Sequence, residues 1–292
     1  MKTTEQILEQ NKLNWNVVKK PLFTYDMNEK DGFHEVNDTP YYGIVREDTG
    51  EVFTTCKKGY TPTQNETIID TMQEIAGEND LEIIKAIPIN EGRKIVVQMK
   101  RPNNRIIIGG QDTDQFIYAI NSHDGTSSLK FGFMNTVIFC QNQFGWLSGN
   151  AMSGYRHTES IQDKVKNLPQ IINFTDQEKR IADLQEFSMQ HATKDLINDT
   201  IDYLSETDLL ATGVDPDMYS SRKLNIRNDI KACIYMEMNR VGHNKWGLFN
   251  GVTRYTTHGK SVPKRDNGRQ ESLLIGSGRT MNEKAFNFLK EN

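Results

Sequence analysis

Three basic side chains are spaced so that they lie on one face of a predicted helix. Lys223, Arg227 and Lys231 follow one another at intervals of four residues within the predicted helix 221–241. Few acidic residues stand among them, whereas a helix stabilised by its own ion pairs would alternate its charges. The spacing therefore predicts a stripe that contacts a polyanion, such as the phosphates of a nucleic acid. A solvated helix face without a ligand is the alternative.

Other basic residues extend this predicted surface. They lie after the helix and on or beside predicted strands: Lys94, Lys100, Arg101, Lys130, Arg254, Lys264 and Arg265. Lys57, Lys58 and Tyr60 also follow a predicted hairpin. Basic groups close to aromatic rings suit a groove for single-stranded nucleic acid, because Lys and Arg contact phosphates while bases stack on the rings. Lysines on strand edges also prevent pairing with other chains, which is the alternative for the sheet residues.

Charge is divided unevenly along the chain of 292 residues. Residues 1–220 carry 21 Lys and Arg against 33 Asp and Glu, and residues 221–292 carry 14 against 6. The whole chain has a formal net charge of −4. A basic final quarter on an acidic body indicates one end that faces a polyanion. An acidic partner protein, or the acidic body of a neighbouring copy, would satisfy the same charge pattern.

A second chemistry is indicated by the pair His123-Asp124, with Asp112 nearby in the sequence. A nuclease needs several carboxylates that converge on divalent ions, and Mg²⁺ would then be the cofactor. Asp124-Gly125 is also a favoured hairpin turn, which requires no chemistry. The other histidines show no metal-ligand spacing, and no serine or cysteine nucleophile motif is present. We therefore expect no cofactor and no covalent chemistry, with the nuclease as an alternative function.

The elements that must position these residues form a sheet-rich front and a helical back. Alternating apolar and polar residues predict strands at 41–46, 51–56, 81–89, 94–100, 115–121 and 127–140. A helical period, with capping boxes at 63–66 and 175–178, predicts helices within 63–77, 175–192, 196–204, 221–241 and at the C-terminus. We expect a short helix at residues 3–13. We expect a loop from there to about residue 40.

This pattern predicts an α+β protein with a mainly antiparallel sheet and an inserted helix (residues ~40–142), followed by a helical C-terminal region. We expect three regions: an N-terminal helix and extension (1–39), a sheet and helix core (40–150), and a helical region with a basic C-terminal segment (151–292).

Composition indicates where such a chain acts. No apolar run approaches the ~20 residues that a membrane-spanning helix needs. The first residues include acids where a secretion signal would have an apolar run. The three cysteines are far apart and form no CxxC pair. These features favour a reducing cytoplasm, with no membrane partner.

Three sequence blocks resemble a known family. One reads NSHDGTSS at 121–128 and continues through FGF at 131–133 to CQN at 140–142. The second reads WGLFNGVTRY at 246–255 and is followed by GSG at 276–278. The third runs from TGE at 49–51 through Lys58 and Tyr60 to TP at 61–62 and QN at 64–65. Together they look like the phage- and plasmid-associated domain-of-unknown-function family numbered nine hundred and thirty-two, over about residues 40–280.

The resemblance implies a mobile-element protein of the bacterial cytoplasm, and it supplies no catalytic residues. Gly251 departs from the alanine that is common at that place in the family, which predicts a looser helix. The order of elements also resembles the β-β-β-α core of single-strand annealing recombinases of the RecT and Redβ kind. That likeness implies an oligomer that holds DNA in a basic groove.

The leading hypothesis is therefore a phage- or plasmid-encoded homo-oligomer that binds single-stranded DNA and anneals it in recombination or replication. The alternatives are the metal-dependent nuclease that uses His123 and Asp124, and a non-catalytic structural or protein-interaction component of a phage.

Overall fold

The computed structural model describes residues 2–27, 34–100, 102, 105–137, 143–145, 152–158, 160–161, 163, 174–208, 215, 218–262, 264 and 267–292. The chain forms two compact units, and each is assembled from three segments. Unit 1 comprises Met1–Pro102, Ile117–Phe131 and Ser153–Ile172. Unit 2 comprises Asn103–Phe116, Gly132–Met152 and Asn173–Asn292.

Unit 1 begins with the predicted short helix, α1 (Thr4–Gln10), and a capping box between Thr3 and Gln6 stabilises its first turn. The expected loop to residue 40 is wrong. That stretch holds two long paired strands, β1 (Val17–Met27) and most of β2 (His34–Arg46). Residues 23–27 alternate apolar and polar side chains as a strand does, but Phe23 and Tyr25 are exposed rather than buried.

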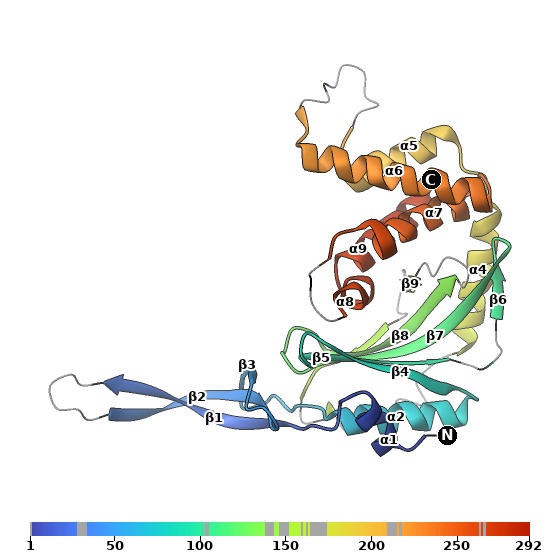
Figure 1. Ribbon diagram of the computed structural model, residues 1–292. Coiled ribbons are helices and arrows are strands. Elements are labelled where there is room, and N and C mark those ends of the chain that lie inside the picture. Colours follow the sequence, from blue (N-terminus) through green and yellow to red (C-terminus); the bar gives the residue numbers. More distant parts are fainter. Residues whose placement is uncertain are drawn as a thin grey trace. The chain divides into compact units, whose positions relative to one another are not determined.

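β1, β2 and β3 (Val52–Lys57) form a three-stranded antiparallel sheet in the order β1-β2-β3. β3 pairs only with residues 41–45 of β2. Beyond that point, residues 23–27 of β1 pair with residues 34–38 of β2 and with no third strand among the described residues. In Figure 1 this hairpin projects from unit 1 as an arm that points away from α1 and α2. We call residues 23–27 with 34–38 the distal arm.

The rest of unit 1 is a helix packed on antiparallel strands. α2 (Asn65–Glu78) buries Ile68, Ile69, Met72 and Ile75, which recur with helical period on one side. It packs on β4 (Glu82–Ile89) and β5 (Lys94–Lys100), and β5 continues to β7 (Gln111–Ser122). These elements confirm the predicted hairpin at 81–100 and the inserted helix.

One local expectation about the start of α2 turns out differently. The capping box at 63–66 is wrong, because the N-cap of α2 is Gln64, without a side-chain cap hydrogen bond. The amide of Gln64 instead pairs with the backbone of Val17, accepting from its N–H at 3.0 Å and donating to its carbonyl at 2.9 Å. This side chain therefore ties the root of β1 to the start of α2.

The larger sheet has the strand order β10-β8-β7-β5-β4, with β6 (Arg105–Ile108) paired to β7 and β9 (Gln143–Gly145) to β8 (Leu129–Val137). Its remaining strand is β10 (Met152–Tyr155). The registers of β4–β5, β5–β7, β6–β7 and β8–β9 are antiparallel. The α+β class and the mainly antiparallel sheet are therefore confirmed.

Unit 2 is dominated by helices, as expected for the C-terminal region. They are α4 (Phe174–Met189), α5 (Lys194–Ser205), α6 (Ser221–Val241), α7 (Lys245–Arg254), the π-helix η2 (Tyr255–Gly259), α8 (Gly268–Leu274) and α9 (Ser277–Glu291). Their core includes the fully buried Trp246, Phe249 and Val252. Among the described residues, no helix is long and apolar enough to cross a bilayer.

Gly251 has a packing role that the sequence did not show. It lies in α7 where that helix crosses α6, and a Cβ atom there would stand 2.2 Å from the Cα of Ile234. Glycine therefore permits a close approach of the two helix backbones, which contradicts the expectation of a looser helix.

Candidate functional site

Two residues of the predicted helix stripe have acidic partners outside their own helix. Arg227 Nε lies 2.6 Å from Asp202 Oδ1 of α5, and the two side chains are 11% and 8% exposed. Lys223 Nζ lies 3.3 Å from Glu206 Oε2, just after α5. Few acids lie within the helix itself, but α5 and its C-cap supply acidic partners to this pair of cations.

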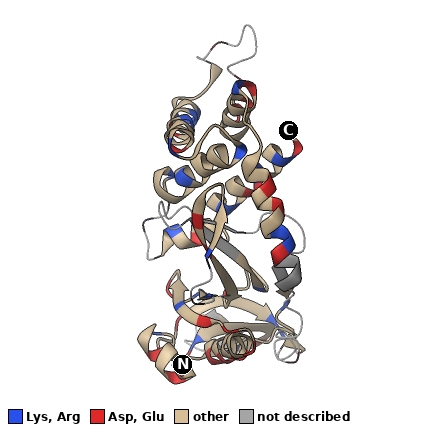
Figure 2. Ribbon diagram, turned by 90° about the vertical axis from the view of Figure 1, so that its right-hand side faces the viewer, with Lys and Arg blue, Asp and Glu red and all other residues tan. Residues whose placement is uncertain are grey.

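The last residue of the stripe, Lys231, and the nearby predicted residue Arg254 differ in how available they are to a ligand. Arg254 Nη1 lies 3.0 Å from Glu237 Oε1, a buried carboxylate of α6. Lys231 is exposed, and its Nζ lies 6.0 Å from the centre of the Tyr235 ring. Figure 2 shows acidic and basic positions interspersed along the helices of unit 2. Part of the positive charge of the last quarter is thus balanced by acids that the fold brings close to it.

The predicted sheet residues do not gather into one basic patch. Lys94 Nζ lies 3.6 Å from Asp124 Oδ2, and the two side chains are 13% and 10% exposed. Lys100 stands at the other end of β5, opposite Glu82, about 20 Å from Lys94 along the strand. Lys130 is partly buried in β8, and Lys264 is exposed. Arg101 and Arg265 lie outside the described residues.

His123 belongs to a buried polar centre in unit 1. The side chain of Asn65 organises this centre from the first residue of α2. Its Nδ2 donates to the carbonyls of Leu13 (3.0 Å) and Trp15 (3.3 Å), and its Oδ1 accepts from His123 Nε2 (2.9 Å). The ring of His123 also lies against the rings of Trp15 and Phe53, with centroids 5.4 and 6.1 Å away. The histidine thereby joins α2 to the segment before β1.

A second histidine completes the centre from the other side. Asn121 Nδ2 donates to the carbonyl of Thr63 (3.1 Å), and Thr63 Oγ1 lies 3.4 Å from His157 Nδ1. The His157 ring stacks on Tyr60 at 5.2 Å. Thr63 is therefore turned into the interior, which explains why it does not cap α2. This arrangement pins the turn between β3 and α2 to the sheet.

Burial keeps both histidines neutral at physiological pH. It lowers the pKa of His123 to about 3, with a smaller contribution from His157. Burial likewise lowers the pKa of His157 to about 4. His123 Nδ1 and Asn121 Oδ1 have no hydrogen-bond partner among the described residues, and both are acceptors. His157 Nε2 is a third buried atom of this centre without such a partner among the described residues, and neither neutral ring supplies a positive charge for a phosphate group.

The side chain of Asp124 is occupied by its own turn. Its Oδ1 accepts from the hydroxyl groups of Ser122 (2.5 Å) and Thr126 (2.6 Å) and from the Thr126 N–H (3.1 Å). Burial is the largest single effect on the pKa of this carboxyl and raises it, but the hydrogen bonds and Lys94 together lower the pKa overall.

In the part of the chain that is described, no three His, Cys, Asp or Glu side chains stand close enough to hold a metal ion. Asp112 is exposed and belongs to unit 2.

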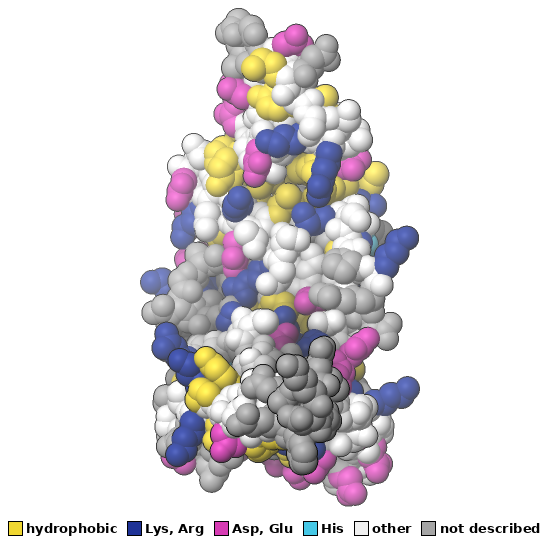
Figure 3. All heavy atoms as spheres, turned by 90° about the vertical axis from the view of Figure 1, so that its left-hand side faces the viewer, with side chains coloured by type: hydrophobic (Ala, Val, Ile, Leu, Met, Phe, Trp, Pro, Cys, Tyr) yellow, Lys and Arg dark blue, Asp and Glu magenta, His cyan; other side chains and the backbone are white. Residues whose placement is uncertain are grey.

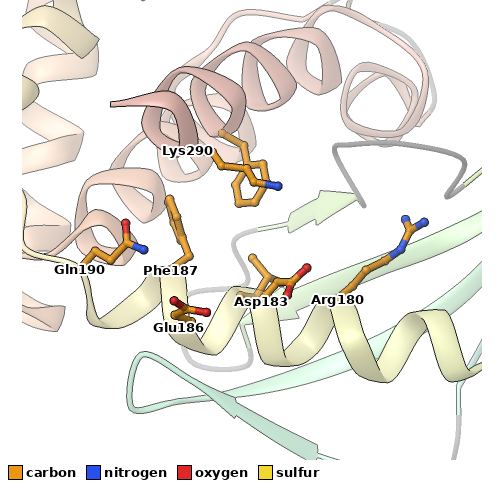
Figure 4. Close-up of a pocket in the computed structure, with 8 residues that line it drawn as sticks. Arg180, Asp183, Glu186, Phe187, Gln190 and Lys290 are labelled. Carbon is orange, nitrogen blue, oxygen red and sulfur yellow. The ribbon is translucent and has the colours of Figure 1, made fainter.

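Unit 2 contains a pocket of ≈ 310 Å³ between α4 and α9 (Figure 4). Its apolar lining comes from Leu184, Phe187 and Phe286. Around them, Arg180 and Lys290 supply two cations, and Asp183 and Glu186 supply two acids. Charges of both signs in equal number give this pocket no preference for a polyanion.

The root of the arm carries a different combination of basic and aromatic side chains. Tyr41 of β2 is directly opposite Lys57 of β3, so their side chains share one face of the sheet. Lys20 of β1 is opposite Gly43, two residues from Tyr41, and therefore lies on the same face. Tyr41 is 46% exposed, and both lysines are exposed without an acidic partner among the described residues. We call Lys20, Tyr41 and Lys57 the arm-root surface.

Only part of this surface is predictable from the sequence. Lys57 stood in the predicted group of basic residues near an aromatic ring, but Lys20 lay in the expected loop. Tyr41 lies in a predicted strand, but the sequence does not show which residues lie beside it on the neighbouring strands. Figure 3 shows Lys and Arg side chains beside exposed hydrophobic ones in the part of the molecule that holds unit 1.

The fold and these surfaces define an α+β protein with a buried polar centre and a basic, aromatic strand surface. The family model described as domain of unknown function (DUF932) matches residues 52–276, which is more than half of the chain. The chain therefore belongs to the DUF932 family. No curated protein and no solved structure matches it. β1 and β2 lie before the matched residues, so the arm is not covered by the family match.

Proposed function

We propose that this protein binds single-stranded nucleic acid on the arm-root surface, without covalent chemistry. The observation that carries the proposal is the exposed Tyr41 ring between two lysines, Lys20 and Lys57, on the open face of a three-stranded sheet. A base stacks on the ring, and the lysines contact the phosphates on either side of it.

Physical chemistry favours a single strand over a duplex at this surface. Bases of a single strand are free to leave their neighbours and stack on an aromatic side chain, which contributes about 1–3 kcal/mol per base. Each lysine that contacts a phosphate releases condensed counterions, so binding depends strongly on salt. Lys58 follows Lys57 and is also exposed, so the positive charge continues past the end of β3.

In the proposed site, the main contacts with nucleic acid are made by residues other than most of the basic residues predicted from the sequence. Arg227 and Arg254 form ion pairs with acidic residues of unit 2. Lys94 forms an ion pair with Asp124. Lys231 and Lys264 are exposed and are the predicted residues best able to add phosphate contacts. Strand annealing, a bacterial cytoplasm and a phage or plasmid origin belong to the same proposal, and the family resemblance supports them.

The test is a titration of labelled oligothymidylate followed by fluorescence anisotropy at several salt concentrations. Tyr41→Ala should weaken binding by about 5- to 100-fold, whereas Tyr41→Phe should keep it, because the ring is what stacks. Lys57→Gln should reduce the slope of log affinity against log salt by about 0.7, the value for one lost phosphate contact on a single strand.

Lys85→Gln is the matched control, since Lys85 is another exposed strand lysine of unit 1. It should leave the salt slope unchanged. Absence of binding at low salt would refute the proposal. Equal effects of Lys57→Gln and Lys85→Gln would refute the assigned surface. Binding should persist in EDTA and leave the oligonucleotide intact, and metal-dependent cleavage would instead favour the nuclease.

A further inference from the structure

The pocket between α4 and α9 combines an aromatic ring with charged groups on each of its two sides (Figure 4). On α4, Asp183 and Glu186 are three residues apart and Phe187 follows Asp183 by four, so all three lie on one side of that helix. On α9, Lys290 follows Phe286 by four residues and lies on the same side as the ring. The two acids of the pocket and its lysine therefore come from different helices.

The floor of the pocket is apolar and firmly held. Leu184, Phe187 and Phe286 form it, and the centroids of the two rings lie 5.1 Å apart with 50° between their planes. All three side chains belong to the buried core of unit 2. A ring laid on this floor gains the offset or edge-to-face contacts that aromatic pairs prefer.

The charges around the floor do not neutralise one another. Among the described residues, Asp183, Glu186 and Lys290 form no ion pair, and all three side chains are exposed. Arg180 also lines the pocket but has another interaction partner, so the positive contact with a ligand falls to Lys290. In Figure 4 the carboxylate of Asp183 and the ammonium group of Lys290 border the same space. A ligand with one cationic and one anionic group complements both sides of this space.

The size of the pocket limits the ligand. Its volume of ≈ 310 Å³ is at the lower end of the range for small-molecule sites. A small zwitterion with one apolar group fits this volume and this charge pattern. An α-amino acid with a ring side chain has that chemistry, because its ammonium and carboxylate groups stand on one carbon and its side chain supplies the apolar part.

We propose that the pocket between α4 and α9 binds a free α-amino acid with an aromatic side chain. The ammonium group pairs with Asp183 and Glu186, the carboxylate pairs with Lys290, and the ring lies on Phe187 and Phe286. The bound amino acid links α4 to α9 and therefore stabilises unit 2. This site is separate from the arm-root surface and does not depend on the binding of nucleic acid.

The test measures the binding of L-phenylalanine to the full-length protein by isothermal titration calorimetry. N-acetyl-L-phenylalanine lacks the ammonium charge, and L-phenylalaninamide lacks the carboxylate. Each analogue should bind about 10- to 100-fold more weakly than L-phenylalanine, because each loses hydrogen bonds between charged groups. Glycine lacks the ring and should bind more weakly than L-phenylalanine as well.

Variants assign each charge of the ligand to its partner. Lys290→Gln should weaken the binding of L-phenylalanine but not that of L-phenylalaninamide, which has no carboxylate to lose contact. Asp183→Asn/Glu186→Gln should weaken the binding of L-phenylalanine but not that of N-acetyl-L-phenylalanine. Glu178→Gln and Lys284→Gln are the matched controls, since they remove exposed charges of the same two helices outside the pocket. Both controls should bind L-phenylalanine like wild type.

The substituted side chains are exposed, so all variants should unfold at the same temperature as wild type without ligand. L-phenylalanine should raise the unfolding midpoint of wild type and of the controls more than that of the pocket variants. Absence of L-phenylalanine binding to wild type, equal binding of N-acetyl-L-phenylalanine or of glycine, or equal losses in the pocket and control variants would each overturn the proposal. Failure of the oligonucleotide titration would leave these results unchanged.

Discussion

Replacing Gly251 by alanine separates the preference of a helix from the packing of two helices. In an isolated helix this change is favourable by about 1 kcal/mol, because alanine restricts the unfolded chain and has the higher helix propensity. In the structure the added Cβ would stand 2.2 Å from Ile234 Cα and 2.7 Å from Ile234 Cγ1. Carbon atoms pack at about 3.5–4.0 Å, so α6 and α7 must separate by roughly 1 Å or more.

That separation disturbs a closely packed core. Ile234, Trp246, Phe249 and Val252 are fully buried around the helix crossing. Overpacking of such a site typically costs about 1–3 kcal/mol, and the obstacle here is backbone, which cannot rotate aside. Because this cost exceeds the gain in propensity, we expect Gly251→Ala to destabilise unit 2 by about 1–2 kcal/mol. The midpoint of thermal unfolding should fall by about 2–8 °C.

Gly77→Ala is the matched control. Gly77 lies in α2, and a Cβ atom there would meet nothing within 4 Å. This substitution should leave the unfolding midpoint unchanged or raise it by a few degrees. Both variants are compared with wild type by the loss of helical circular dichroism on heating. If Gly251→Ala is as stable as wild type or more stable, the close approach of α6 and α7 is refuted.

Three further predictions concern charged and titratable groups inside the units. Asp202→Asn should destabilise unit 2 by about 3 kcal/mol in chemical denaturation, because it leaves Arg227 without its partner in a nearly buried pair. In the oligonucleotide assay, Arg227→Gln should leave the salt slope unchanged, and a slope reduced by about 0.7 would show that Arg227 contacts phosphate instead. The pKa of His123 is about 3 in the folded chain against an ordinary 6.5, so protons favour the unfolded state between these values. Stability present above pH 6.5 should be lost as the pH falls toward 3, and His123→Gln should show a shallower fall of the unfolding midpoint over that range. Parallel pH profiles of the two proteins would contradict the assignment.

Local sequence patterns determined most of the elements in this chain. The helical period of 221–241 matches α6, and the alternation at 81–100 matches the β4–β5 hairpin. Trp246, Phe249 and Val252 of α7 are fully buried in the core of unit 2. These elements bury one face or stripe, and burial of one face is what produces a periodic sequence. The prediction missed β1 and the outer part of β2, although Phe23, Tyr25 and Met27 alternate with polar residues. Phe23, Tyr25 and Val36 of these strands are exposed, so burial does not mark them as core strands.

The candidate site depended on contacts between distant segments. Lys20, Tyr41 and Lys57 meet only through the register of three strands, which no spacing along the chain reveals. The same holds for the polar centre, where Asn65, His123 and His157 come from a helix, a turn and a later segment. The sequence places His123 beside Asp124 as a candidate for metal-dependent chemistry, but the hydrogen bond of His123 to Asn65 holds its ring inside unit 1.

The sequence by itself determined the number of basic residues and their spacing, the α+β class and the family. Only the tertiary structure decided which of those charges are available to a ligand. Asp202 and Glu206 neutralise part of the α6 stripe, whereas the lysines at the root of the arm have no such partner among the described residues. The reason is physical: a charge is cancelled by the groups within a few ångströms of it, and folding, not sequence order, brings those groups together.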